Sequence, residues 1–154
     1  MRGFVCAAAI AFAAALPLAV PADPVEENPG ASDLDPDFAA GKKAIEAKEW
    51  TAAIKSLSSA ALRDTRNADI QNYLGFAYRN AGDLDNAFRH YEKALTLSPR
   101  HRGAHEYVGE AYLMAGNLAK AEEHLAKLRE ICLVPCEEYD DLRKKVEAYR
   151  ARGR

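Results

Sequence analysis

The residues of this chain that could carry out chemistry are cysteines and histidines at helical spacing. Cys132 and Cys136 are four positions apart, close enough for a disulfide and also for a pair of thiol or copper ligands. His101 and His105 are four positions apart as well, so they would share one face of a helix and could hold a metal together. No carboxylate or third ligand can be predicted beside them from the sequence, and we therefore predict no metal site.

Catalytic motifs are missing from the sequence. It contains no G-x-S-x-G, no G-x-x-x-x-G-K-S/T, no G-x-G-x-x-G and no H-E-x-x-H. His90 and His124 occupy equivalent places in two helices and are expected on the surface. These observations predict a protein that is not an enzyme and has no cofactor.

The charge of the chain excludes one class of partner. Its 154 residues suit a single domain, and the formal net charge of -2 gives no clustered excess of Lys and Arg. Because nucleic-acid binding depends on such basic clusters, we expect no nucleic acid among the partners.

The first residues predict export. Arg2 precedes an apolar, alanine-rich run, and Val20, Pro21 and Ala22 place small residues before a cleavage site, as in a secretory signal peptide spanning 1–22. The alternative is an uncleaved membrane anchor, but a run of roughly 14 apolar residues is shorter than the roughly 20 that a membrane-spanning helix needs. Residues 23–33, rich in Pro and acids, read as a flexible linker. We expect a periplasmic or secreted protein without stable membrane insertion.

Export affects how the cysteines are interpreted. Cys6 would be removed with the signal peptide, leaving Cys132 and Cys136 in an oxidising compartment, where two nearby cysteines favour a structural disulfide. The alternative is a redox or copper-handling accessory protein that uses this pair.

Two segments of the chain are nearly the same. Residues 73–87 and 107–121 agree at eight of fifteen positions and are 34 residues apart. In the first, Leu74, Ala77 and Tyr78 follow the spacing of one helix face. Gly82 then suits the left-handed residue that ends a helix, and Asp83 can cap the next. The sequence thus predicts repeated helix pairs.

The repeat resembles the tetratricopeptide repeat. The residues that carry the resemblance are Leu74, Gly75, Tyr78, Ala87, Tyr91 and Pro99. It implies an all-α, right-handed α-solenoid of three helix pairs, over 34–67, 68–101 and 102–135, followed by a capping helix and basic tail over 136–154. Repeat one departs from the pattern, with Ala44 at the tyrosine position and Lys48 at the turn glycine. The cap would bury Tyr139, Leu142, Val146 and Tyr149 on the open end of the solenoid.

In this family the first helices of the repeats line a concave groove, which implies a binding site for a peptide or a protein. The predicted lining consists of Asn72, Tyr73, Phe76, Arg79, Asn80, Glu106, Tyr107 and Glu110. The Lys and Asn residues with which some members hold a terminal carboxylate are absent, since those places contain Phe38, Lys42, Tyr73, Gly103 and Tyr107. The lining predicts a segment with apolar and basic side chains. The alternative is that Tyr73 and Tyr107 only pack between neighbouring helices.

Overall fold

A computed structural model describes residues 35–134 and 136–153. The expected signal peptide (1–22), the linker (23–33) and Pro135 lie outside the described residues. Within the described part the chain forms seven α-helices and no strand: α1 (Pro36–Glu46), α2 (Trp50–Arg63), α3 (Ala68–Asn80), α4 (Leu84–Leu97), α5 (Arg102–Met114), α6 (Leu118–Ile131) and α7 (Glu137–Arg152). The predicted all-α fold of helix pairs followed by a further helix is confirmed.

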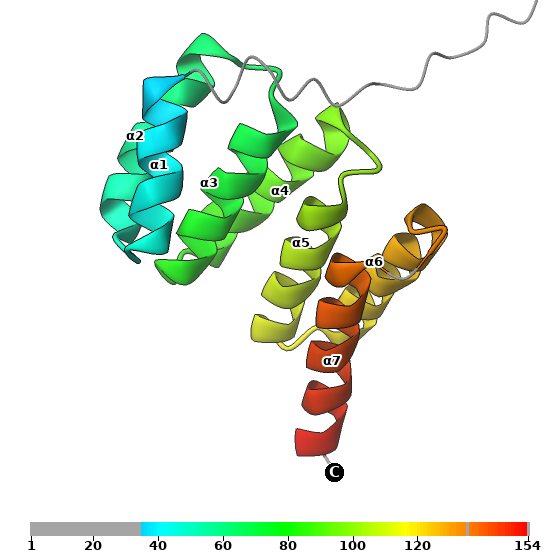
Figure 1. Cartoon of the computed structure of the whole chain (residues 1–154). Coiled ribbons are helices and arrows are strands. Elements are labelled where there is room, and N and C mark those ends of the chain that lie inside the picture. The colour runs from blue at the N-terminus through cyan, green and yellow to red at the C-terminus, as the bar shows by residue number, and fades with distance from the viewer. Residues whose placement is uncertain (1–34, 135, 154) are drawn as a thin grey trace, which may run out of the picture.

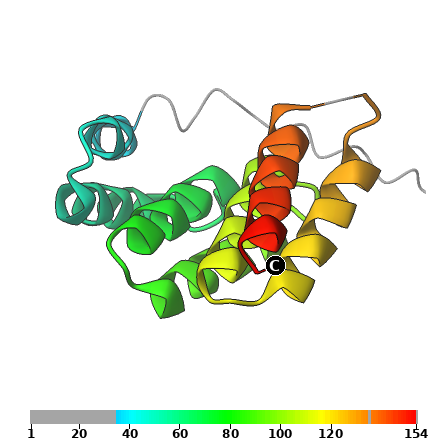
Figure 2. The ribbon, with the colours of Figure 1, turned by 90° about the horizontal axis from the view of Figure 1, so that it is seen from below.

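The helices are arranged as a stack of pairs. Helices α1 and α2, α3 and α4, and α5 and α6 pack as pairs, and α1, α3, α5 and α7 follow one another as successive neighbours (Figure 1). The view turned by 90° again shows α7 beside α5 and α6 (Figure 2). Helix α7 therefore continues the row of first helices. No helix among the described residues is long and apolar enough to span a bilayer.

The turn inside each pair has a left-handed residue at the same repeat position. Gly82 and Gly116 have φ values of 87° and 77°, in the region that glycine adopts without steric cost. Asp83 and Asn117 then cap the following helices by accepting hydrogen bonds from backbone N–H groups. In the first pair the same place is held by Lys48, with φ 59°. The turn geometry is thus preserved where the glycine is missing.

Three further glycines, also 34 residues apart, allow close helix packing. A Cβ atom on Gly41 would lie 2.5 Å from Cγ of Leu57, and one on Gly75 would lie 2.5 Å from Cε1 of Tyr91. At Gly109 the nearest side chain comes from the cap, because a Cβ there would lie 2.6 Å from Cδ2 of Leu142. Leu142 of α7 therefore occupies the space beside Gly109, as side chains of the second helix do beside Gly41 and Gly75.

The core runs along the stack in three clusters. The first joins α1, α2 and α3, the second joins α4 and α5, and the third joins α6 and α7. In the third cluster Leu142 and Val146 of α7 are fully or almost fully buried beside Ala121 and Leu128 of α6. The cap is therefore part of the core.

Candidate functional site

A cleft of about 380 Å³ opens among α3, α5 and the first turns of α7. Its lining residues come from three neighbouring first helices and the residue before α5: Asp69, Asn72, Tyr73, His101, Arg102, Gly103, Glu106, Tyr107, Glu137, Glu138 and Asp141. Five of these side chains are carboxylic acids, against a single arginine. The cleft is thus an acidic hollow at the end of the row of first helices.

The predicted groove residues divide between two hollows. Asn72, Tyr73, Glu106 and Tyr107 line the acidic cleft. Arg79 and Glu110 line a second hollow of about 530 Å³, further along α5 and α7. Phe76 lies between them, in ring contact with Tyr107 at 4.9 Å. Asn80 is exposed and donates a hydrogen bond to the backbone oxygen of Phe76, and it lines neither hollow.

Tyr73 and Tyr107 pack between helices and also line the cleft. The ring of Tyr73 contacts that of Phe38 on α1, with centroids 5.5 Å apart, and Tyr107 contacts Phe76 on α3. Both tyrosines are half-buried. Burial, followed by the neighbouring carboxylate of Glu106, raises the pKa of Tyr107 to about 12, so its hydroxyl keeps its proton and can donate a hydrogen bond.

The second hollow contains a three-membered ion-pair chain. The carboxylate of Glu110 on α5 accepts from Arg79 on α3 through one oxygen and from Lys145 on α7 through the other. The guanidinium of Arg79 also lies over the rings of Phe76 and Tyr107, 5.1 and 5.5 Å from their centroids. Arg79 and Glu110 are 6% and 9% exposed. At this level two cations neutralise the buried acid.

One helical turn earlier on α5, Glu106 has no such partner. Its side chain is 8% exposed and makes no hydrogen bond or ion pair with any described residue. Burial, followed by repulsion from Glu110, raises the pKa of Glu106 to about 7. Asn72, which also lines the cleft, is 4% exposed, and its side-chain oxygen lacks a hydrogen-bond donor. The Glu106 carboxylate and the Asn72 side-chain oxygen are both acceptors.

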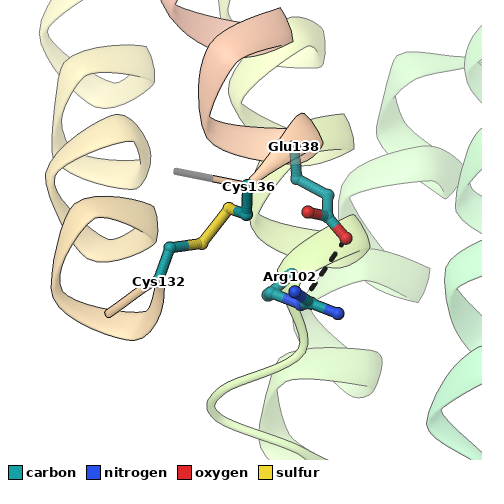
Figure 3. The surroundings of a disulfide bond; sticks show 4 residues. All are labelled: Arg102, Cys132, Cys136 and Glu138. Carbon is teal, nitrogen blue, oxygen red and sulfur yellow. Dashed lines mark ion pairs between the residues drawn. A yellow bond between two sulfur atoms is a disulfide. The ribbon is translucent and has the colours of Figure 1, made fainter. Parts of the chain in front are cut away.

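The mouth of the cleft is held by polar contacts. His101 caps α5 by accepting from the backbone N–H of Ala104 through Nδ1, while its Nε2 lies 2.9 Å from Asp69. Arg102 lies 3.5 Å from Glu138, which joins the starts of α5 and α7 (Figure 3). The capping role explains why His101 is not paired with His105: the two side chains have different partners.

The other three histidines take part in packing. His105 contacts the backbone oxygen of Pro99 through Nε2 and His124 through Nδ1, at 3.0 and 2.9 Å. His124 stacks on Tyr112, and His90 stacks on Tyr78 while contacting Gln71. The expectation that His90 and His124 are plain surface residues is wrong, because both are half-buried between their helix and the preceding one. Burial lowers the pKa of His124 to about 4 and keeps it neutral.

Cys132 and Cys136 are joined in the structure by a disulfide, with Cα atoms 6.0 Å apart (Figure 3). The bond links the residue after α6 to the residue before α7, close to the Arg102–Glu138 pair at the cleft. Among the described residues no group of three or more His, Cys, Asp or Glu side chains could hold a metal ion.

The sequence-based site lacked the contribution of α7. Glu137, Glu138 and Asp141 line the cleft, although the cap was interpreted only as a cover for the core. The acidic start of α7 was a visible signal, but acids in a first turn are also the ordinary complement of a helix dipole. His101 and Arg102 were missed because their places in the repeat lie at the start of the helix.

Comparison with known proteins agrees with this architecture. The family model described as tetratricopeptide repeat matches residues 66–133. Similar solved structures include the type III secretion translocator chaperone SycD of Yersinia enterocolitica, with 18% identity, a TM-score of 0.68 and coverage of 76% of this chain and 83% of that one. PcrH in complex with the chaperone binding region of PopD has 21% identity, a TM-score of 0.69 and coverage of 79% and 94%.

A yeast structure, the TPR2B domain of Sti1 in a complex with pHsp70, has 17% identity, a TM-score of 0.69 and coverage of 77% and 95%. No curated protein sequence matches the chain. At these identities the likeness concerns the fold.

Proposed function

Since this chain is a tetratricopeptide-repeat protein, we propose that it is a non-catalytic interaction module that binds an extended peptide segment along its row of first helices. The observation that carries the proposal is the cleft among α3, α5 and α7, where Asn72, Tyr73, Glu106 and Tyr107 meet from positions more than 30 residues apart. Two of the similar folds are described as complexes with a protein segment or partner, PopD for PcrH and pHsp70 for Sti1.

The site is suited to anchoring the side chains of a bound segment. The two half-buried tyrosines provide apolar and aromatic surface, which is what the energetically important residues of protein interfaces use. The acidic groups around them favour partners with positive charge. We further propose that the protein works outside the cytoplasm, in keeping with the apolar start of its sequence.

The proposal is tested by crosslinking in the cell. A photo-crosslinking residue at Glu137, which is exposed at the rim of the cleft, is expected to capture a discrete partner identifiable by mass spectrometry. The same residue at Glu92, exposed on α4 away from the cleft, is the control and is expected to capture nothing in common with it.

In the same experiment Tyr107→Ala should weaken capture at least tenfold, roughly 1.4 kcal/mol. Tyr112→Ala is the matched control, because Tyr112 is a half-buried tyrosine on the same helix that lies outside the cleft. Circular dichroism must first show both variants to be folded. Equal capture from Glu137 and Glu92, or equal loss with both tyrosine variants, contradicts the proposal.

A further inference from the structure

Two consecutive turns of α5 each carry a buried glutamate, and only one of the two glutamates is paired with cations. Glu110 and Glu106 lie one turn apart on the same face of the helix, and both are buried to nine-tenths or more. Glu110 is neutralised by two cations, Arg79 from α3 and Lys145 from α7. Glu106 has neither a hydrogen bond nor an ion pair with any described residue. A buried carboxylate without a partner is costly, so this difference calls for a cause.

The neighbouring helices supply the wrong groups for Glu106. One turn before Lys145 on α7 stands Asp141, and about two turns before Arg79 on α3 stands Asn72; both line the cleft beside Glu106. Asp141 repels the carboxylate, and the side-chain oxygen of Asn72 is a second buried acceptor that lacks a donor. Lys145, whose positive charge acts on Glu106 from α7, is held by Glu110. The cleft therefore presents an excess of acceptors and negative charge over Arg102, the one Lys or Arg in its lining.

The chain itself shows what fits such a place. One turn further along α5, the guanidinium of Arg79 bonds to the buried carboxylate of Glu110 and lies over the ring of Tyr107. The cleft at Glu106 is bordered by the same ring together with Tyr73, and a cation near aromatic rings gains further stabilisation. A volume of about 380 Å³ accommodates one long side chain.

We propose that the cleft at Glu106 is a specificity pocket for one basic side chain, arginine or lysine, of an extended peptide. The charged group bonds to the Glu106 carboxylate and the Asn72 oxygen, and its aliphatic part lies against Tyr73 and Tyr107. Asp69, Glu137, Glu138 and Asp141 at the rim attract the cation from solution. This inference rests on the proposed function, which requires only that a peptide bind the row of first helices.

The test compares two blocked pentapeptides, Ala-Ala-Arg-Ala-Ala and the same peptide with citrulline, the neutral isostere of arginine. Each is titrated into the whole protein at pH 8 and followed by amide NMR signals. The arginine peptide is expected to shift the signals of Gly103, Glu106 and Tyr107 and to bind at least tenfold more tightly than the citrulline peptide. Glu106→Gln should remove this preference, whereas Glu92→Gln, which makes the same charge change on exposed α4, should retain it.

Agmatine, which contains the guanidinium without a peptide backbone, distinguishes a peptide pocket from a site for free cations. Agmatine binding as tight as the arginine peptide overturns the peptide assignment. Equal affinity of the arginine and citrulline peptides, or a preference that survives in folded Glu106→Gln, overturns the pocket. If Glu106→Gln does not fold, the comparison of the two peptides on the wild-type protein decides.

The two proposals fail separately. A partner captured from Glu137 without any preference for arginine over citrulline leaves the interaction module in place and removes the pocket. An arginine preference at the cleft without a captured partner supports the pocket, since a peptide then binds the row of first helices, and removes only the cellular partner expected from the crosslinking.

Discussion

At the scale of single residues, the ionised carboxylate of Glu106 is expected to lower the stability of the fold, and the same carboxylate is the proposed partner of a basic side chain. The residue is 8% exposed and its carboxylate pairs with no cation among the described residues, so the ionised form is disfavoured in the folded state. The repeat pattern placed Glu106 on the inner side of α5, and the structure agrees. The pattern could not show that Glu106 is unpaired, because this depends on Asp141 and Lys145, which belong to a helix outside the repeat.

Burial of Glu106 makes the stability of the fold depend on pH. The pKa of Glu106 rises from 4.5 to about 7 on folding, so the folded protein holds a proton that the unfolded chain has lost between these values. Stability contributed by Glu106 is therefore present below about pH 4.5 and lost as the pH rises through 7. We expect Glu106→Gln to be more stable than the wild type at pH 8, by about 1–3 kcal/mol, with the difference disappearing at pH 4.

Urea unfolding of both proteins at several pH values measures this difference. The charged groups that bear on Glu106 come from the same helix and from α7: Glu110, Glu138, Asp141 and Lys145. Glu92→Gln is the control and should run parallel to the wild type at every pH. Parallel curves for Glu106→Gln as well would mean that Glu106 is not held in a costly state.

At the scale of the elements, the 34-residue period predicted the helix pairs and their turns. It failed to predict two departures that arise from tertiary contacts. Lys48 adopts the left-handed turn conformation without being glycine, because the helices on either side fix the chain there. Gly109 receives Leu142 from α7, where the first two repeats use the second helix of the same pair.

We expect Gly109→Ala to loosen α7. The new methyl group would lie 2.6 Å from Cδ2 of Leu142, which is fully buried and has little room to move. The overpacking is expected to cost about 1–3 kcal/mol, which outweighs the gain of up to about 1 kcal/mol in helix propensity.

Relative to the wild type, hydrogen exchange in Gly109→Ala is expected to become faster across Glu137–Arg152 and to stay unchanged across α1 and α2. Gly153→Ala is the matched control, since the nearest atom to a Cβ there is 3.9 Å away. A Gly109→Ala variant as stable as the wild type, with unchanged exchange in α7, would contradict the packing described here.

At the scale of the whole molecule, the architecture was predictable and the composition of the site was not. A repeated sequence pattern predicts which helices pack together, because each repeat must bury its apolar face against the next repeat. The acidic cleft lies where the repeat meets the cap, and no periodicity describes that junction. Glu137, Glu138 and Asp141 could therefore be placed only once the path of α7 was known.

Export and the state of the cysteines can be tested in one measurement. The intact mass of the protein recovered from the periplasm is expected to correspond to a chain that begins at Asp23 and lacks two hydrogens, one from each of Cys132 and Cys136. Reduction should restore both hydrogens. Retention of Met1 in a membrane fraction would contradict export, and two free thiols in the oxidised, metal-free protein would favour the copper-handling alternative.

The participation of α7 in the third core cluster has a consequence for the order in which the molecule is made. The first cluster is complete once synthesis has passed Ala77, whereas the third needs Leu142 and Val146. A chain that becomes available for folding from its N-terminus can thus form its first repeats early, whereas α5 and α6 keep an open apolar face until α7 follows. The cleft needs the first turns of α7 as its third wall, so it forms only after the first repeats have folded.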